Sequence, residues 1–308
     1  MHRTLRRGLL AAATMIAVSI GITATPVNAA PPGHRTAASI PARGLPTLGC
    51  GTCTLLWDLL NAGGRNGLVA IGLSDGQRLI KFAANRPGLA CTIGPVDLPG
   101  SEVLISIDFR VQDGGLYGVG NNGGIYALNT RTAAATKVSQ LTVALNGTSF
   151  GIDFNPAADR LRIISDTGQN LRHNINPGGT TLVDGPLTYP PSTAAVGVTA
   201  AAYTNNDLNP ATATTLFDID TNLDQVVLQS PANSGQLAAT GALGVNANLQ
   251  AGFDIHSTLS GDRAVANNAY AVLNGSRLYR VDLLTGAAQT TGAFNGHVVV
   301  DLALLLRQ

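Results

Sequence analysis

Residues 150–187 read FGIDFNPAADRLRIISDTGQNLRHNINPGGTTLVDGPL and contain four short apolar runs. The runs are separated by turn sequences that contain Asn-Pro, Asp-Thr-Gly and Asn-Pro-Gly-Gly. These residue types favour tight turns, because they supply a fixed φ, a positive φ or a side chain that bonds the local backbone. Four short strands joined by such turns predict an antiparallel meander.

The meander recurs along the chain. When the first apolar run of each unit is aligned, four aspartates and one tyrosine fall in the same register, at spacings of 45, 50, 51 and 47 residues: Asp108, Asp153, Tyr203, Asp254 and Asp301. Units of this length with four strands each are typical of β-propellers. The sequence therefore predicts an all-β propeller.

The ends of the chain indicate how the ring closes. Residues 67–93 supply three strands and lack an inner one, whereas residues 298–304 form an inner strand with no blade after it. We predict that the C-terminal strand completes the first blade and closes a ring of five four-stranded blades, which leaves no open sheet edge. The alternative is a ring of six, with Trp57-Asp58 in an additional inner strand.

The composition agrees with an all-β protein. The 308 residues include 36 glycines, only two lysines (Lys81 and Lys137) and one glutamate, Glu102. Long helices draw on Glu, Lys, Leu and Met, and this chain is poor in three of these. The length fits one large β domain preceded by a leader.

The N-terminus predicts export. Residues 1–29 combine a basic start, an apolar run and small residues before Ala29, which is the pattern of a signal peptide cut near Ala29. An uncleaved anchor is the alternative, because the apolar run is at the short end of a membrane span. We expect a disordered linker over 30–48, a short capping segment over 49–66 and the propeller domain over 67–308. The expected location is secreted, outside the cell.

Charge excludes two classes of partner. Without residues 1–29 the chain has 16 basic and 18 acidic residues, a net charge of −2. Nucleic acid and anionic membranes bind basic patches, so we expect neither as a partner once the signal is cleaved. We expect a monomer that binds an extracellular ligand.

Three cysteines remain in the chain without its signal: Cys50, Cys53 and Cys91. In an oxidising compartment one pair should be bridged. A redox motif expects a βαβ context and structural zinc expects four ligands, and neither is present here. We predict a structural disulfide from Cys91 to Cys53, with Cys50 as the alternative partner.

Motifs for known chemistry are missing. There is no Ser-x-x-Lys, and the histidines of the domain (His173, His256, His297) lie in no HExxH frame. The glycine-rich stretches precede no helix, so no phosphate-binding loop and no cofactor are predicted. Residues 218–224 space aspartates like the start of a calcium loop, but Leu223 stands where that loop needs glycine. We interpret them as a strand that ends in a turn.

The four register aspartates (Asp108, Asp153, Asp254 and Asp301) are the candidate site residues, and two arrangements fit them. Each carboxylate could accept backbone amides of the neighbouring blade, as buried carboxylates commonly do. Alternatively, the four could converge on the channel, where repulsion would favour a bound cation or raised pKa values. We favour the structural arrangement, since Tyr203 interrupts the set. Catalytic residues and a bound metal are therefore not predicted.

The repeated segments resemble a known family, the bacterial domain of unknown function 4394, whose members are secreted and propeller-like. The resemblance covers about residues 67–306 and is carried by the segments at Leu104–Phe109, 115–118, 151–156, 160–170, 201–205, 216–221, 252–255 and 300–303. It implies a fold and a compartment. Because that family has no established activity, it implies no site residues.

Two functions follow from the sequence. The first is a non-catalytic propeller that binds an extracellular polymer, protein or small ligand at one face of the ring. The second is a propeller enzyme, a lyase or hydrolase that uses aspartates and arginines at the channel mouth, with or without a metal. The absence of a recognisable nucleophile–base pair favours the first.

Overall fold

The computed structural model describes residues 67–74 and 77–306. The signal peptide, the linker, the capping segment, Cys50, Cys53 and Trp57-Asp58 lie outside these residues. Within them there is no α-helix, and so none that is long and apolar enough to cross a membrane.

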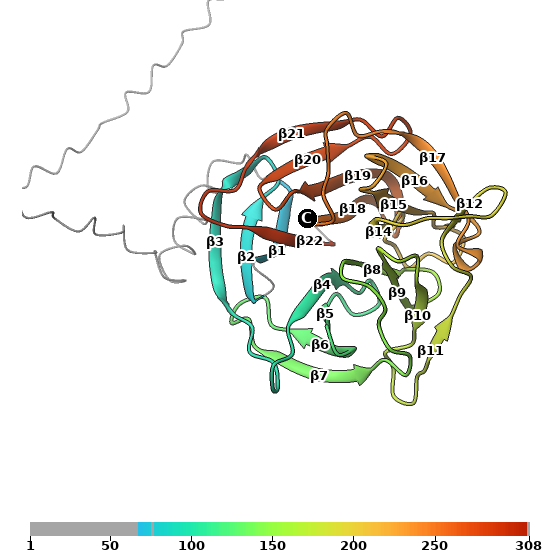
Figure 1. Cartoon of the computed structure of the whole chain (residues 1–308). Helices are drawn as coiled ribbons and strands as arrows, with labels where there is room; N and C mark the ends of the chain where they lie inside the picture. The colour runs from blue at the N-terminus through green and yellow to red at the C-terminus, as the bar shows by residue number, and fades with distance from the viewer. Residues whose placement is uncertain (1–66, 75–76, 307–308) are drawn as a thin grey trace, which may run out of the picture. The chain divides into compact units, whose positions relative to one another are not determined.

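Five four-stranded antiparallel sheets stand around a central axis (Figure 1). From the axis outward, blade 1 is β22 (Val299–Leu304), β1 (Val69–Ser74), β2 (Arg78–Ala83) and β3 (Arg86–Pro95); blade 2 is β4 (Leu104–Phe109), β5 (Leu116–Gly120), β6 (Gly124–Leu128) and β7 (Ala135–Gln140); blade 3 is β8 (Phe150–Asn155), β9 (Arg160–Ser165), β10 (Asn170–His173) and β11 (Thr181–Val183); blade 4 is β14 (Val198–Tyr203), β15 (Leu216–Asp220), β16 (Gln225–Gln229) and β17 (Leu237–Ala242); blade 5 is β18 (Ala251–Ser260), β19 (Arg263–Leu273), β20 (Arg277–Val281) and β21 (Ala288–Ala293). The all-β, propeller and five-blade predictions are confirmed.

The last strand closes the ring. β22 pairs antiparallel with β1, with Ala70 opposite Leu304 and Leu73 opposite Asp301. This is the predicted completion of the first blade by the C-terminal strand. The six-blade alternative is wrong, because β22 of blade 1 is followed around the axis by β4 of blade 2 and the ring is complete with five sheets.

Glycines bring some inner strands unusually close together. A Cβ at Gly151 would lie 2.6 Å from Cα of Ala200 on the next inner strand, and one at Gly252 would lie 2.5 Å from Cα of Asp301. Each glycine stands two residues before a register aspartate. Because side chains alternate along a strand, the side of the strand on which the glycine has no Cβ is the side on which the aspartate lies. The close approach therefore lets Asp153 and Asp254 reach across to the next blade.

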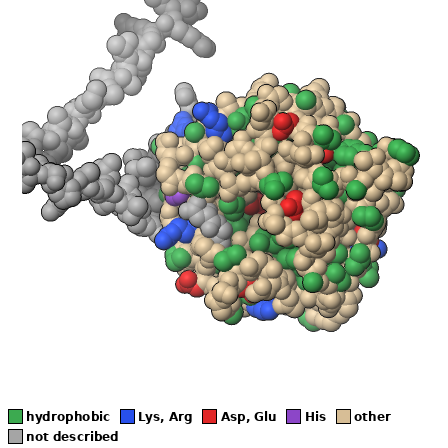
Figure 2. All heavy atoms as spheres, viewed as in Figure 1, with side chains coloured by type: hydrophobic (Ala, Val, Ile, Leu, Met, Phe, Trp, Pro, Cys, Tyr) green, Lys and Arg blue, Asp and Glu red, His purple; other side chains and the backbone are tan. Residues whose placement is uncertain are grey.

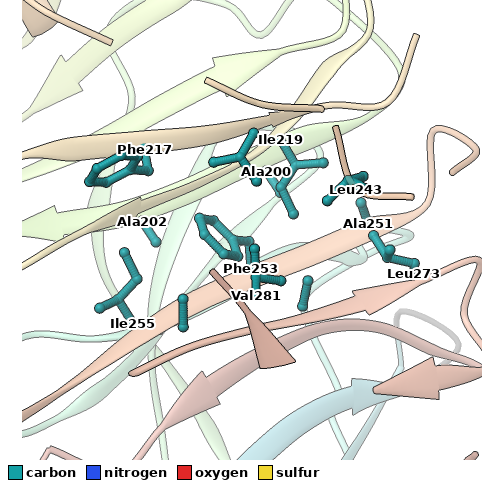
Figure 3. Close-up of a cluster of buried hydrophobic side chains, with 13 residues drawn as sticks. Ala200, Ala202, Phe217, Ile219, Leu243, Ala251, Phe253, Ile255, Leu273 and Val281 are labelled. Atoms are coloured by element: carbon teal, nitrogen blue, oxygen red, sulfur yellow. The ribbon is translucent and has the colours of Figure 1, made fainter. Parts of the chain in front are cut away.

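Apolar clusters fill the spaces between blades. Between blades 4 and 5, Ala200, Ala202 and Phe217 pack against Phe253 and Ile255 (Figure 3). These residues alternate along their strands, so one side of each sheet packs against one neighbour and the other side against the next. A small hairpin that the sequence did not predict, β12 (Thr188–Tyr189) with β13 (Thr193–Ala194), lies between blades 3 and 4 in the chain.

Candidate functional site

The four register aspartates lie on the inner strands and are buried, with 2–6% of their surface exposed. One carboxylate oxygen from each of Asp108, Asp153 and Asp254 lies within 4.8 Å of the other two. Carboxylate oxygens at this spacing are ligands that a hard cation such as calcium uses. These three residues are thus the group among the described residues that could hold a metal ion.

The same carboxylates join the blades. Asp108 Oδ2 accepts the amide of Phe154 from blade 3 at 2.8 Å, and its Oδ1 accepts its own neighbour, Phe109, at 2.7 Å. Asp301 likewise accepts the amide of Ile107 from blade 2 at 2.8 Å.

The remaining pair follows the same pattern. Asp254 accepts the amide of Leu304 from blade 1 at 2.5 Å, and Asp153 accepts that of Tyr203 from blade 4. The structure therefore combines both arrangements that the sequence allowed: the carboxylates bond to neighbouring strands, and three of them also converge.

Burial makes these carboxylates weak acids. It is the largest cause that raises the pKa of Asp254 and of Asp301, each to about 7. The pKa values of Asp108 and Asp153 are also raised, first by burial and then by the neighbouring aspartates. Protons can thus relieve the repulsion without a cation.

Tyr203 does not take the role of a fifth aspartate. Its hydroxyl accepts Nε of Arg162 in blade 3 at 3.3 Å, so its side chain points to the preceding blade, whereas the aspartates bond to the following one. Side chains alternate along a strand, so Ala202 stands on the side that the aspartates use. Between blades 4 and 5 an apolar contact replaces the carboxylate.

An ionic network that the sequence did not predict lies between blades 3 and 4. Arg162 is 3% exposed and donates to Asp184, Asn170 and Asn233, each at 2.7 Å. Nearby, Asp218 is fully buried and neither oxygen has a hydrogen-bond partner among the described residues. Burial raises the pKa of Asp218, and Arg162 opposes that shift. The sequence around Arg162 is apolar and did not indicate this ionic network, because the partners of Arg162 are distant in sequence.

The aspartates of residues 218–224, whose spacing is like the start of a calcium loop, do not form a group that could hold a metal ion. Asp220 Oδ1 accepts the amides of Asn222 and Leu223, each at 3.0 Å, while Asp224 Oδ1 accepts the amide of Ala247 at 2.7 Å. With Asp218 inside the sheet, these carboxylates cap a turn and a loop, as the turn interpretation expected.

The histidines of the domain are dispersed. His173 is fully buried, with its ring nitrogens against Ser139 and Thr181, and His256 Nδ1 lies 3.1 Å from the carbonyl of Leu305. His297 is half-buried before β22. Cys91 lies half-buried on β3. Its expected partners are outside the described residues, so the disulfide stays a prediction.

Two cavities adjoin at the face where the inner strands end. They have volumes of about 530 and 590 Å3 and share three lining residues, Val111, Leu208 and Leu306. Val111 follows β4, Leu208 follows β14 and Leu306 follows β22, so the chain brings them to one end of the ring. We call this two-lobed hollow the mouth. Figure 2 shows one face of the molecule, on which few charged side chains are visible.

The two lobes differ in charge. The smaller is lined by Lys81, Arg131 and Asp113, and we call it the basic lobe. The larger is lined by Asp207 and Asp262, with no lysine or arginine among the described residues of its lining, and we call it the acidic lobe. Sequence reasoning missed both, because loops of different blades build them.

Arg110, at the edge of the mouth, is fully engaged. It donates to Asp159 through Nε and Nη2 at 2.7 and 2.6 Å, to Asp113 at 2.8 Å and to Asn176 at 2.9 Å. The hydrogen bonds from Arg110 are the largest cause that lowers the pKa of Asp159. This cluster fastens blade 2 to blade 3.

The fold and the axial carboxylates define a five-bladed β-propeller. The chain belongs to the family described as Domain of unknown function (DUF4394), whose model matches residues 78–303. The family resemblance is thereby confirmed. Among curated proteins, none matches the chain.

Solved structures with similar folds include a chain of the nidogen/laminin complex, with 12% identity and a TM-score of 0.46, covering 78% of this chain and 99% of that one. A protein of unknown function from Bacteroides thetaiotaomicron has 11% identity and a TM-score of 0.46, covering 74% and 55%. The glutaminyl cyclase of Myxococcus xanthus has 12% identity and a TM-score of 0.37, covering 75% and 92%. Similarity this low carries no inference about function.

Proposed function

We propose that this chain is a secreted, non-catalytic binding module that holds an extracellular ligand at the mouth of the propeller. One observation carries the proposal: two adjoining cavities of about 530 and 590 Å3 open on the same face and share Val111, Leu208 and Leu306. Ligand sites in proteins are concave, and single sites commonly have volumes of about 300–1,000 Å3. Loops from several blades build the mouth, as is common for binding sites on rigid scaffolds.

The contacts at the mouth support binding over catalysis. The hydroxyl of Ser257 donates to Asn267 at 2.7 Å, and His256 Nδ1 faces the Leu305 carbonyl. No described hydroxyl that lines the mouth has a hydrogen bond to a histidine, so the lining holds no nucleophile–base pair of the usual kind.

The alternative is a propeller lyase or hydrolase, and the converging carboxylates of Asp108, Asp153 and Asp254 are the observation in its favour. Those carboxylates are buried and bonded to backbone amides, and they line neither lobe of the mouth. Arg110, the arginine nearest in sequence to Asp108, donates its hydrogen bonds to two aspartates and an asparagine. Because the carboxylates and this arginine already have partners within the protein, a structural role is favoured over a catalytic one.

Three further expectations belong to the proposal. The leader of residues 1–29 directs the bacterial protein out of the cell, Cys91 pairs with Cys53 or Cys50, and the mature protein is a monomer. Near-neutral charge supports a partner other than nucleic acid or membrane. Non-reducing peptide mapping of secreted protein tests the pairing.

A thermal-shift screen of polysaccharides, peptides and metal ions tests the function, because a ligand selective for the native state raises the melting temperature. The shift produced by a hit should vanish in Leu208→Asp, which puts a charge into the lining shared by both lobes. Val183→Asp is the matched control, because Val183 is an exposed apolar residue on the outer strand β11. A shift that persists in Leu208→Asp would move the site away from the mouth.

A further inference from the structure

Asp218, in the middle of β15, is a buried carboxylate without a partner among the described residues. No part of its surface is exposed, and neither oxygen takes part in a hydrogen bond with them. Its neighbours on the adjacent strands are Ala201 and Val227, which are themselves buried and apolar. Opposed residues of antiparallel strands lie close together on one side of the sheet, so apolar groups stand beside the carboxylate.

The axial aspartates differ from Asp218, because other strands supply them with donors. Asp108 accepts two backbone amides, and Asp301 accepts the amide of Ile107 and the hydroxyl of Ser106. Hydrogen bonds of this kind stabilise a buried carboxylate in its ionised form. Asp218 receives none from the part of the chain that the structure describes, so no donor offsets the effect of its burial.

Arg162 is the cation that faces Asp218, and its nitrogens already donate to other acceptors. Nε donates to Tyr203, Nη1 to Asp184 and Nη2 to Asn233. Burial is the largest cause that raises the pKa of Asp218, and the charge of Arg162 opposes this shift without reversing it. A metal ion beside Asp218 would be repelled by the charge of Arg162, whereas a proton removes the negative charge and leaves the acid neutral.

The other charged groups at the junction between blades 3 and 4 pair with one another. Asp184 lies 2.7 Å from Arg162 Nη1 and 3.0 Å from Arg172 Nε, and the hydroxyl of Tyr189 donates to Asp220. The adjacent strand β16 carries no titratable residue. Arg172 is 35% exposed, so the row formed by Arg162, Asp184 and Arg172 leads from the interior of the junction to solvent.

We propose that Asp218 is a neutral carboxylic acid in the folded protein, and that its proton makes the junction between blades 3 and 4 a pH-sensitive joint. Loss of the proton leaves a charge among apolar side chains without a donor. Such a charge is unfavourable in the interior, so water must enter the junction to solvate it. The row of Arg162, Asp184 and Arg172 is the route by which water reaches it. At raised pH the junction therefore loosens before the rest of the ring.

The pH dependence of stability in wild type and Asp218→Asn tests the inference, because asparagine has the shape of the neutral acid and cannot ionise. A pKa raised in the folded state stabilises the wild type in full below the ordinary aspartate pKa, and this gain is lost as the pH rises. The ratio of unfolding equilibrium constants, wild type over Asp218→Asn, should therefore rise about tenfold for each pH unit above about 4, until Asp218 ionises in the folded protein. Denaturant titrations of the whole purified protein from about pH 4 to about pH 9 measure this ratio.

Asp159→Asn is the matched control in blade 3. Hydrogen bonds from Arg110 are the largest cause that lowers the pKa of Asp159, so the contribution of Asp159 is complete above the ordinary aspartate pKa. The ratio for this variant should stay constant above about pH 4. Hydrogen exchange locates the joint: at the alkaline end of the range, β15 should exchange faster in wild type than in Asp218→Asn, whereas β2 of blade 1 should exchange equally in both.

A ratio for Asp218→Asn that stays constant above about pH 4 overturns the inference, because Asp218 then ionises alike in the folded and unfolded protein. A ratio that rises while β15 exchanges equally in both proteins overturns the joint, because ionisation then does not open the junction. Asp218→Leu, which removes the charge without adding amide donors, takes the place of Asp218→Asn if that variant does not fold. Failure of both variants to fold would show that the junction needs the carboxylate charge and would also overturn the inference.

Discussion

The aspartates at the axis and those at the mouth differ in what their oxygens contact. At the axis, Asp108 and Asp254 are 6% and 4% exposed and accept backbone amides from the next blade. At the mouth, Asp262 is exposed, and from the described part of the chain it accepts one long hydrogen bond, from Asn209 at 3.3 Å. The same side chain thus joins strands in one place and remains available to a ligand in the other. The difference teaches that the aspartates conspicuous in the repeat are not for that reason the functional ones.

Removal of the closing strand should have the largest effect on the axis. A chain that ends at Asn295 lacks β22, and with it the buried Val299, Leu302 and Leu304. Burial of three such side chains stabilises by several kcal/mol, so we expect loss of the folded ring and aggregation through its open sheet edges. Light scattering and thermal melts check this, with a chain that ends at Leu306 as the control. A monomer that melts like the full protein would contradict ring closure by β22.

Asp108→Ala should have the next largest effect. It removes the acceptor of two amides, Phe109 and Phe154, and unsatisfied buried donors should lower the free energy of unfolding by roughly 1–3 kcal/mol. Tyr203→Phe is the control, because it removes only a hydroxyl whose bond to Arg162 is 3.3 Å long. Denaturant titration measures both. An equal loss in the two variants would remove the distinction between the aspartates and their register neighbour.

The periodicity of the sequence was enough to predict the blades and the inner strands that carry the axial aspartates. Strands of four to six residues, turn residues between them and a repeat of 45 to 51 residues define the blades. The incomplete unit at each end then required β22 to join β1. The position of Tyr203 was misjudged, since a register taken from apolar runs is ambiguous by one residue in a strand such as 198–203. A shift of one residue moves a side chain to the other side of the sheet.

The mouth and the network of Arg162 could not be predicted in this way. Val111, Leu208 and Leu306 are far apart in the chain, and each follows a different inner strand. Likewise, Arg162 meets Asn233 from another blade, 71 residues away. Such contacts depend on loop conformations and on the ring geometry, which local patterns do not contain.

A smaller effect is expected in the way the stability difference between wild type and Asp254→Ala changes with pH. Burial raises the pKa of Asp254 to about 7, so its stabilising contribution is complete below the ordinary aspartate pKa and is lost as the pH rises through about 7. The difference in unfolding free energy between wild type and Asp254→Ala should therefore shrink between about pH 5 and about pH 8.

A comparison of variants is needed, because His173 and His256 act in the opposite direction. Burial lowers the pKa values of these histidines, so their contribution to the unfolding free energy grows as the pH rises toward the ordinary histidine pKa. This contribution is the same in wild type and in Asp254→Ala and cancels in the difference. Tyr203→Phe should show a flat difference, since burial raises the pKa of Tyr203 above its ordinary value of 10.0. A difference for Asp254→Ala that is constant or grows with pH would refute raised axial pKa values.

The response to calcium tests most directly whether the axial carboxylates are structural. Asp153 is the most deeply buried of the three aspartates whose carboxylates converge. If these carboxylates are structural, bound protons and backbone amides stabilise them without a cation. We predict that calcium at about a thousand times a typical sensor-site Kd of 10⁻⁶ M leaves the melting temperature of the wild type unchanged. The melting temperature of Asp153→Ala should be lower and equally insensitive to calcium. A melting temperature that rises with calcium in the wild type, and stops responding in Asp153→Ala, would make the channel the binding site and contradict the account.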